Sequence, residues 1–92
     1  MIIYAEVECV MYEGHSLRHK RSILKRLIAK LKKDLNVAVS ELDHQDVWQR
    51  TKIGIVTISN KMNHAEKTID EVLKRIDGFP ELERTITNVE RL

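Results

Sequence analysis

The first twelve residues alternate between two kinds of side chain with a period of two. One set is wholly apolar and the other mixes apolar with acidic residues, which is typical of a β-strand that buries one face. The segment that follows contains Gly14, which permits a turn, and Ser16, which can cap a helix. The predicted buried face consists of Ile3, Ala5, Val7, Cys9 and Met11.

From Leu17 to Leu35 the apolar residues recur with the period of an α-helix. At about 100° per residue they occupy one side, and basic residues fill the whole opposite half. Lys20 is the exception, because it points to the centre of the apolar side at the helix start. From there its ammonium group either reaches past the core to the end of the sheet or extends back to water. The cations of the opposite half are Arg18, Arg21, Lys25, Arg26, Lys30, Lys32 and Lys33.

Two further strands are expected at residues 36–42 and 52–59. The polar segment between them favours a hairpin with a long tip. Apolar side chains occupy both faces of the later strand, so we expect cover on both. Its Ile53 and Ile55, with Ile2 and Tyr4 of the first strand, are expected to form an apolar patch on the open face of the sheet.

A second amphipathic helix is expected to begin at residues 60–63, where "NHAE" places Asn63 at the cap of a capping box. It is expected to end near Asp77 and Gly78, shortly before Pro80. The tail "ELERTITNVERL" alternates weakly and predicts a last strand at an edge of the sheet.

The order β-α-β-β-α-β predicts a single α+β domain over residues 1–92 with the ferredoxin-like fold, a four-stranded antiparallel sheet with two helices on one face. The chain has no run of eighteen apolar residues, so no membrane span is expected. Its N-terminus lacks the basic region of a signal peptide. One cysteine, Cys9, allows no internal disulfide, and we expect it to pack in the core of a cytoplasmic protein.

Charge is distributed unevenly along the chain. Between Arg18 and Lys33 there are eight lysines and arginines and no acid, whereas the rest carries 8 of the 16 basic residues and all 14 acidic ones. A helix with a net charge of +8, on a protein whose remainder carries −6, bears on what the protein binds more than on how it folds. Phosphate binding is one interpretation and solubility is the other. The predicted nucleic-acid contacts are Arg18, Lys20, Arg21, Lys25, Arg26, Lys30 and Lys33.

Patterns for catalysis are weak. The loop before the first helix lacks the glycine-rich phosphate loop of an acylphosphatase, an enzyme of this fold. Asp43, His44 and Asp46 could ligate a metal or act as acid and base, but their spacing matches no strong metal pattern. An anion-dependent enzyme using Lys20, Arg21 and this group is therefore the least favoured hypothesis. No catalytic residue, metal or cofactor is expected.

The segment "ELDHQDVWQR" (residues 41–50) places the only tryptophan in polar surroundings. An indole there usually lies on the end of the core, although interfaces also favour Trp with Arg nearby. We expect Trp48 to be partly buried and partly offered to a partner, with Asp43 and Asp46 holding the turn. The predicted hairpin contact consists of Asp43, Gln45, Asp46, Trp48, Gln49 and Arg50.

A standard RNA-recognition sheet is not expected, because that module stacks bases on aromatic residues of its central strands. Residues 52–59 contain no aromatic side chain, and the first strand offers only Tyr4. Any RNA would therefore bind through the basic helix and the hairpin, with salt-sensitive and weakly sequence-specific affinity.

Three motifs carry a resemblance to a known family: "SLRHKRS" (residues 16–22), "SELDHQDVWQR" (residues 40–50) and "GIVTISN" (residues 54–60). They resemble the YlxP-like family of small bacterial proteins, a domain family of unassigned function. The resemblance implies a ferredoxin-like fold and brings no catalytic residue. It also implies a ribosome-associated role by association, because family genes commonly lie near genes for translation initiation and ribosome maturation. The motif positions here are Ser16, Leu17, Lys20, Arg21, Asp43, Gln45, Asp46, Trp48 and Gln49.

His19 stands where family members often carry an acid, which makes this helix start more basic. The favoured function is a non-enzymatic, cytoplasmic protein associated with RNA or the ribosome. A protein-interaction or scaffolding module is the alternative. A homodimer through the open sheet face, or another cover for that face, is also expected, since the apolar patch would otherwise lie in water.

Overall fold

The computed structural model describes residues 1–12 and 16–92, so the turn expected at Gly14 lies outside the described residues. The chain forms the six expected elements in the expected order. They are β1 (Ile2–Val10), α1 (Leu17–Asp34), β2 (Val37–Asp43), β3 (Arg50–Ile58), α2 (Met62–Asp77) and β4 (Glu83–Arg91).

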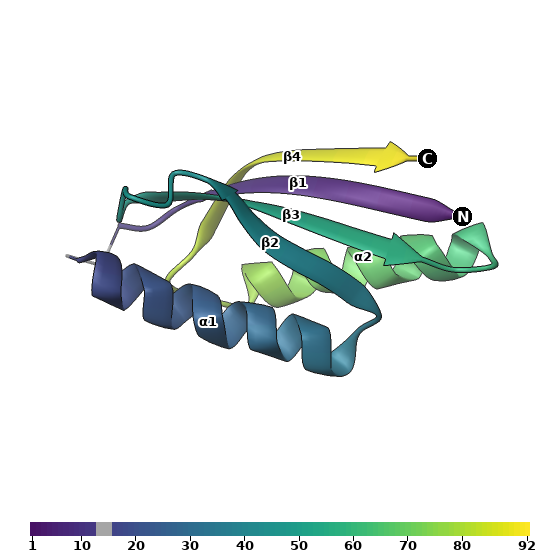
Figure 1. The fold of residues 1–92 in the computed structure, drawn as a ribbon, viewed down its shortest axis with the longest axis horizontal. Helices are drawn as coiled ribbons and strands as arrows, with labels where there is room; N and C mark the ends of the chain where they lie inside the picture. The colour runs from purple at the N-terminus through teal and green to yellow at the C-terminus, as the bar shows by residue number, and fades with distance from the viewer. Residues whose placement is uncertain (13–15) are drawn as a thin grey trace.

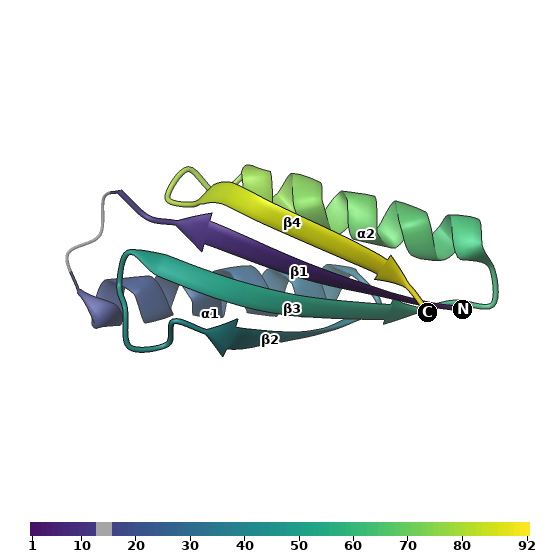
Figure 2. The ribbon, with the colours of Figure 1, turned by 90° about the horizontal axis from the view of Figure 1, so that it is seen from above.

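The four strands form one antiparallel sheet in the order β2-β3-β1-β4. Both helices lie on one face of this sheet, with α1 against β2 and α2 against β1, β3 and β4 (Figures 1 and 2). This arrangement confirms the ferredoxin-like fold. It also leaves β2 and β4 at the two edges, as predicted for the last strand.

The core fills the space between the sheet and the two helices. All five residues of the predicted β1 face are buried, with at most 3% of each exposed. Each helix contributes four apolar residues at spacings of three and four, which is the stripe that an amphipathic helix buries. The helix contributions are Ile23, Leu24, Leu27 and Leu31 from α1 and Ala65, Ile69, Val72 and Ile76 from α2.

The two faces of β3 differ from the prediction. Ile53 and Ile55 are fully buried beneath the helices, so they take no part in an open patch. The exposed side chains are Val56 and Ile58, whose β1 partners are Tyr4 and Ile2. Cross-strand partners share a face, so the apolar patch is built from the other half of the β3 alternation.

The predicted helix ends are confirmed in part. Ser16 caps α1 as predicted, since its Oγ accepts a hydrogen bond from His19 N at 3.1 Å. Helix α2 ends before Gly78, also as predicted. The capping box at Asn63 is wrong, because the N-cap of α2 is Lys61, two residues earlier, and Lys61 makes no side-chain cap bond. Instead, Ser59 Oγ accepts from Lys61 N at 3.2 Å and turns the chain into the helix.

Candidate functional site

The solvent side of α1 is a row of exposed cations without acidic partners. Six of its lysines and arginines form no ion pair with any residue in the described ranges 1–12 and 16–92. On α2, by contrast, acidic residues lie among the basic ones, and Arg75 pairs with both Asp34 and Glu71. The six exposed cations of α1 are Arg18, Arg21, Lys25, Lys30, Lys32 and Lys33.

Arg26 is the cation of α1 that has a partner. Its Nη2 lies 2.9 Å from Glu81 Oε2, and its guanidinium group lies 5.7 Å from the centre of the Phe79 ring. The Arg26 hydrogen bond is the main reason that the pKa of the Glu81 carboxyl is lowered. Arg26 therefore holds α1 to the loop between α2 and β4, and it has less charge to offer a ligand than its neighbours.

Of the six cations unpaired within the described residues, helix geometry places most away from that loop. At about 100° per residue, four of them fall within roughly 60° of one another on the flank of α1 away from α2. With a rise of about 1.5 Å per residue they extend over roughly 21 Å of the helix axis. These four residues are Arg18, Arg21, Lys25 and Lys32.

Lys20 lies inside the protein, with 1% of its surface exposed. Its Nζ donates to the carbonyl oxygens of His44 at 2.5 Å and Val47 at 2.7 Å, and it lies 3.0 Å from Glu41 Oε2. The predicted contact between Lys20 and nucleic acid is therefore wrong, because no phosphate can reach this nitrogen. The alternative prediction, that Lys20 reaches past the core to the end of the sheet, is confirmed.

The loop of residues 44–49 joins β2 to β3 and lies at the same end of the molecule as the start of α1 (Figures 1 and 2). His44 has a φ of 64°, a left-handed conformation that is uncommon for a residue with a side chain. Asp43 Oδ1 accepts a hydrogen bond from His44 N at 2.7 Å. That bond is the main reason that the pKa of the Asp43 carboxyl is lowered.

Asp43 thus holds the turn as predicted, whereas Asp46 is exposed and no hydrogen bond links its carboxylate to the described part of the chain. Trp48 is half-buried, which agrees with the expected partial burial of its ring. The remaining predicted contact residues, Gln45, Gln49 and Arg50, are exposed. The structure therefore brings this set together on one loop beside the first turn of α1.

Asp43 and His44, which the enzyme hypothesis invokes, are engaged with the protein itself. The His44 imidazole Nε2 lies 3.3 Å from Glu8 Oε1, which Arg50 also contacts at 3.3 Å. Within residues 1–12 and 16–92, no three His, Cys, Asp or Glu side chains are grouped so as to hold a metal ion. Lys20, one of the two cations of that hypothesis, is hydrogen-bonded to loop carbonyl oxygens beneath the loop.

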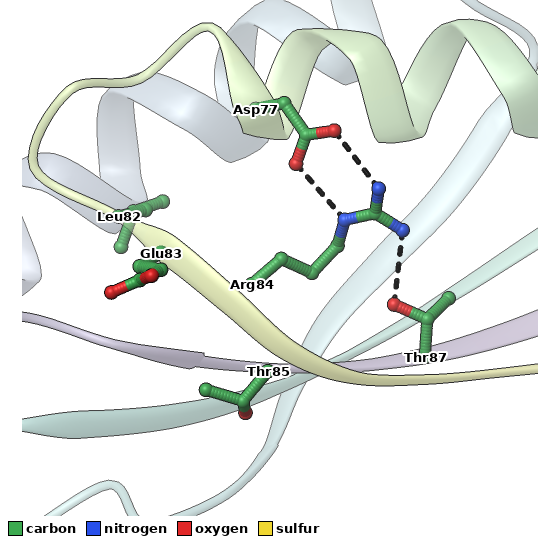
Figure 3. A pocket seen from close by; sticks show the side chains of 6 residues that line it. All are labelled: Asp77, Leu82, Glu83, Arg84, Thr85 and Thr87. Atoms are coloured by element: carbon green, nitrogen blue, oxygen red, sulfur yellow. Dashed lines mark hydrogen bonds and ion pairs between the residues drawn. The ribbon is translucent and has the colours of Figure 1, made fainter.

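A polar hollow of about 410 Å³ lies beside Arg84, at the start of β4. Figure 3 shows Arg84 donating to both carboxylate oxygens of Asp77, each at 2.9 Å, and to Thr87 Oγ1 at 3.0 Å. No sequence pattern predicts the contacts among Arg84, Asp77 and Thr87. The arrangement ties the end of α2 to β4, and the guanidinium group of Arg84 is already paired with Asp77 and Thr87.

The single cysteine lies nearby in the core. Burial raises the pKa of the Cys9 thiol to about 11, as expected for a core cysteine.

The open face of the sheet is divided into an apolar half and a charged half. In the apolar half, a hollow of about 190 Å³ lies over Gly54, where Leu42 packs so closely that a Cβ would lie 2.8 Å from its Cδ1. Tyr4 and Val56 also line this hollow. In the charged half, Lys52 Nζ lies 2.6 Å from Glu6 Oε1.

Three similar solved structures support the fold alone, because each is below 20% identical to this chain. SnoaB, a cofactor-independent oxygenase from Streptomyces nogalater crystallised as a point mutant, has a TM-score of 0.65 at 7% identity, covering 99% of this chain and 92% of SnoaB. A de novo designed protein with a ferredoxin fold has a TM-score of 0.65 at 15% identity, covering 100% and 87%. A C-terminal segment of the alpha subunit of aIF2 from Pyrococcus abyssi has a TM-score of 0.56 at 18% identity, covering 100% and 50%.

In the described part of the chain, no helix is long and apolar enough to cross a lipid bilayer. The chain is 47% identical over 90 residues to "Uncharacterized protein YlxP" of Bacillus subtilis (strain 168), and the alignment covers 98% of both chains. Residues 2–89 match the family described as "Protein of unknown function (DUF503)". The chain therefore belongs to the DUF503 family, which confirms the YlxP-like resemblance of its motifs.

Proposed function

We propose that this protein binds RNA, alone or within the ribosome, through the exposed cations of α1 and the β2–β3 loop. It acts in the cytoplasm and catalyses no reaction. The observation that carries the proposal is the set of six exposed cations on α1 that form no ion pair with the described residues. A cation without an acidic partner can neutralise a phosphate and release its counterions without first breaking an internal pair.

The charge of the sheet supports the helix side as the binding surface. Glu6 and Glu8 lie on the open face of the central strand β1, where they pair with Lys52 and Arg50, so the cations of this face are already engaged by carboxylates. The other central strand, β3, has no aromatic residue on which bases could stack. The proposed surface therefore lies on the opposite side from the one that an RNA-recognition sheet uses.

The test is the triple substitution Lys25→Gln, Lys30→Gln and Lys33→Gln. All three side chains are exposed and unpaired within the described residues, so each change should alter stability by no more than about 0.5 kcal/mol. Affinity for Bacillus subtilis ribosomes and for their purified RNA should fall. The slope of log K against log salt should flatten by roughly 0.7–0.9 for each lost phosphate contact.

A matched control removes the same charge from α2 and its N-cap through Lys61→Gln, Lys67→Gln and Lys74→Gln, at side chains that are also exposed. The control should bind like the unmodified protein and keep its salt slope. If both triple variants lose affinity equally, net charge rather than α1 is responsible. If neither variant changes affinity or slope, the proposal for α1 is wrong.

A second candidate function is self-association through the open sheet face, for which the exposed apolar side chains there are the specific observation. Val56 and Ile58 are 38% and 60% exposed, and they adjoin Ile2, which is 37% exposed. Together with the hollow over Gly54 they form a contiguous apolar area on one half of the face. We propose a second copy of this chain as the occupant. This surface lies on the far side of the sheet from α1, so dimerisation and RNA binding are compatible.

A further inference from the structure

We infer that Lys20 is a positioning residue for RNA binding. Its buried ammonium group holds the β2–β3 loop against the start of α1, so that helix and loop present one rigid surface. The inference rests on the proposed function for its effect on binding. Its effect on the loop can be measured separately.

The ammonium group of Lys20 has three N–H donors, and three oxygen atoms surround it. Two are carbonyl oxygens of the loop, those of His44 and Val47, and the third belongs to Glu41 at the end of β2. A buried lysine is costly unless its charge is paired and its hydrogen bonds are satisfied. Here two hydrogen bonds to the loop and one ion pair engage the ammonium group, so the loop provides the site that makes burial of Lys20 possible.

The two loop carbonyls are held in a conformation that the chain would rarely adopt unaided. His44 has a φ of 64°, and a left-handed residue with a side chain persists only where its surroundings fix it. The N–H of His44 donates to the Asp43 carboxylate. The carbonyl oxygen of His44 accepts from both Lys20 Nζ and Val47 N. Lys20 therefore acts on both ends of the turn formed by residues 44–47.

The far end of the loop and the base of the site are also fixed. Met11 N donates to Gln49 O at 2.8 Å, which ties the loop to the end of β1. Glu41 Oε2, the carboxylate oxygen beside Lys20, also accepts from Thr51 Oγ1 at 2.6 Å. Thr51 is fully buried on β3. The network thus joins α1, β2 and β3, and removing Lys20 alone would leave Glu41 without its cation.

The role of Lys20 differs from that of the exposed cations in a measurable way. Lys20 is 1% exposed, so a phosphate cannot reach its ammonium group and it contributes no released counterion. Its removal should weaken binding by disordering the loop, while the dependence of affinity on salt stays the same. An exposed lysine of α1 should show the reverse, a small loss of affinity with a flatter salt dependence.

The experiment compares three variants of the full chain: Lys20→Met, the double variant Lys20→Met with Glu41→Gln, and Lys25→Met. Methionine keeps the apolar stem of the lysine. The single Lys20 variant can fail to fold, because it leaves the partly buried Glu41 carboxylate without its cation. The double variant removes that charge and keeps the net charge of the protein. Lys25→Met is the control, since Lys25 lies on the same helix and is exposed.

Amide hydrogen exchange of residues 44–49 is measured first, with Val47 N as the reporter because it donates to His44 O. Exchange there should rise at least tenfold in the double variant, the scale of one lost hydrogen bond to a charged group, and stay unchanged in Lys25→Met. Exchange in α2 is the internal control for global unfolding. Unchanged exchange of the loop in a folded double variant would overturn the inference.

Binding to ribosomal RNA is measured second, over a series of salt concentrations. The double variant should bind about tenfold more weakly with an unaltered salt slope, whereas Lys25→Met should flatten the slope. A looser loop with unchanged affinity would also overturn the inference, since the loop would then have no part in binding. If the unmodified protein binds neither ribosomes nor RNA, the proposed function fails, and the exchange data alone decide whether Lys20 orders the loop.

Discussion

At the scale of single residues, Lys20 and Trp48 occupy neighbouring places with different roles. Lys20 is buried and satisfied by the backbone of the loop, whereas Trp48 is half-buried on the same loop. A half-buried indole can stabilise its own hairpin and still offer one edge to a partner. The loop is therefore held from inside by Lys20 and carries a half-buried aromatic side chain.

Truncation of Trp48 tests this division. A fully buried tryptophan costs about 3–5 kcal/mol when replaced by alanine, so Trp48→Ala should cost about 1–2 kcal/mol in urea unfolding. Binding to ribosomal RNA should suffer more than stability. The control is Tyr12→Ala, because Tyr12 is 73% exposed and its loss should cost within about 0.5 kcal/mol. Trp48 is the only tryptophan, so its fluorescence reports the loop directly. An emission insensitive to quenchers and RNA would show a plain core residue.

The sequence could predict that Lys20 is unusual, because a lysine stood at the centre of an apolar helix face. It could not predict which atoms receive the ammonium group. Two of the three acceptors are backbone carbonyls of the loop, and every residue type supplies the same carbonyl. Their position depends on the left-handed φ of His44, for which a histidine gives only a weak signal. The predicted phosphate contact failed for that reason.

At the scale of elements, the start of α1 carries the local information that the proposed site needs. Ser16 caps the helix, and the first turn that it fixes contains Arg18 and precedes Lys20. The cap was predictable because a serine preceded a strongly periodic segment. The start of α2 was not, since "NHAE" has the spacing of a capping box while Ser59 already turns the chain two residues before Lys61. A motif match does not detect that a nearby serine side chain already accepts the hydrogen bond of the N-cap residue.

Replacing the cap gives a prediction for this element. Ser16→Ala should destabilise the protein by about 1 kcal/mol, because the N–H of His19 loses its acceptor. Ser22→Ala is the control, since Ser22 is exposed in the middle of the same helix and alanine is the better helix former. Urea unfolding of both variants gives the comparison. The cap assignment would be contradicted if the two variants were equally stable.

At the scale of the whole molecule, the sheet separates two surfaces with different chemistry. The helix side carries the cations of α1, and the open side carries apolar and acidic residues. The fold was predictable because six elements with clear periodicity match one arrangement. The composition of the open face was predicted wrongly at Ile53 and Ile55, since period-two alternation does not say which face of β3 the helices cover.

The apolar half of the open face gives the prediction for the whole molecule. We expect the protein to self-associate there, so light scattering at rising concentration should show a dimer. Val56→Lys should return it to a monomer without loss of stability, because Val56 is exposed and lies at the centre of the apolar half. Ile86→Lys is the matched control, since Ile86 is 51% exposed on β4 beside Glu8, in the charged half. Because α1 lies on the other side of the sheet, RNA affinity should be equal in the two variants. A protein that stays monomeric at millimolar concentration, with or without Val56→Lys, would show that water alone covers this face.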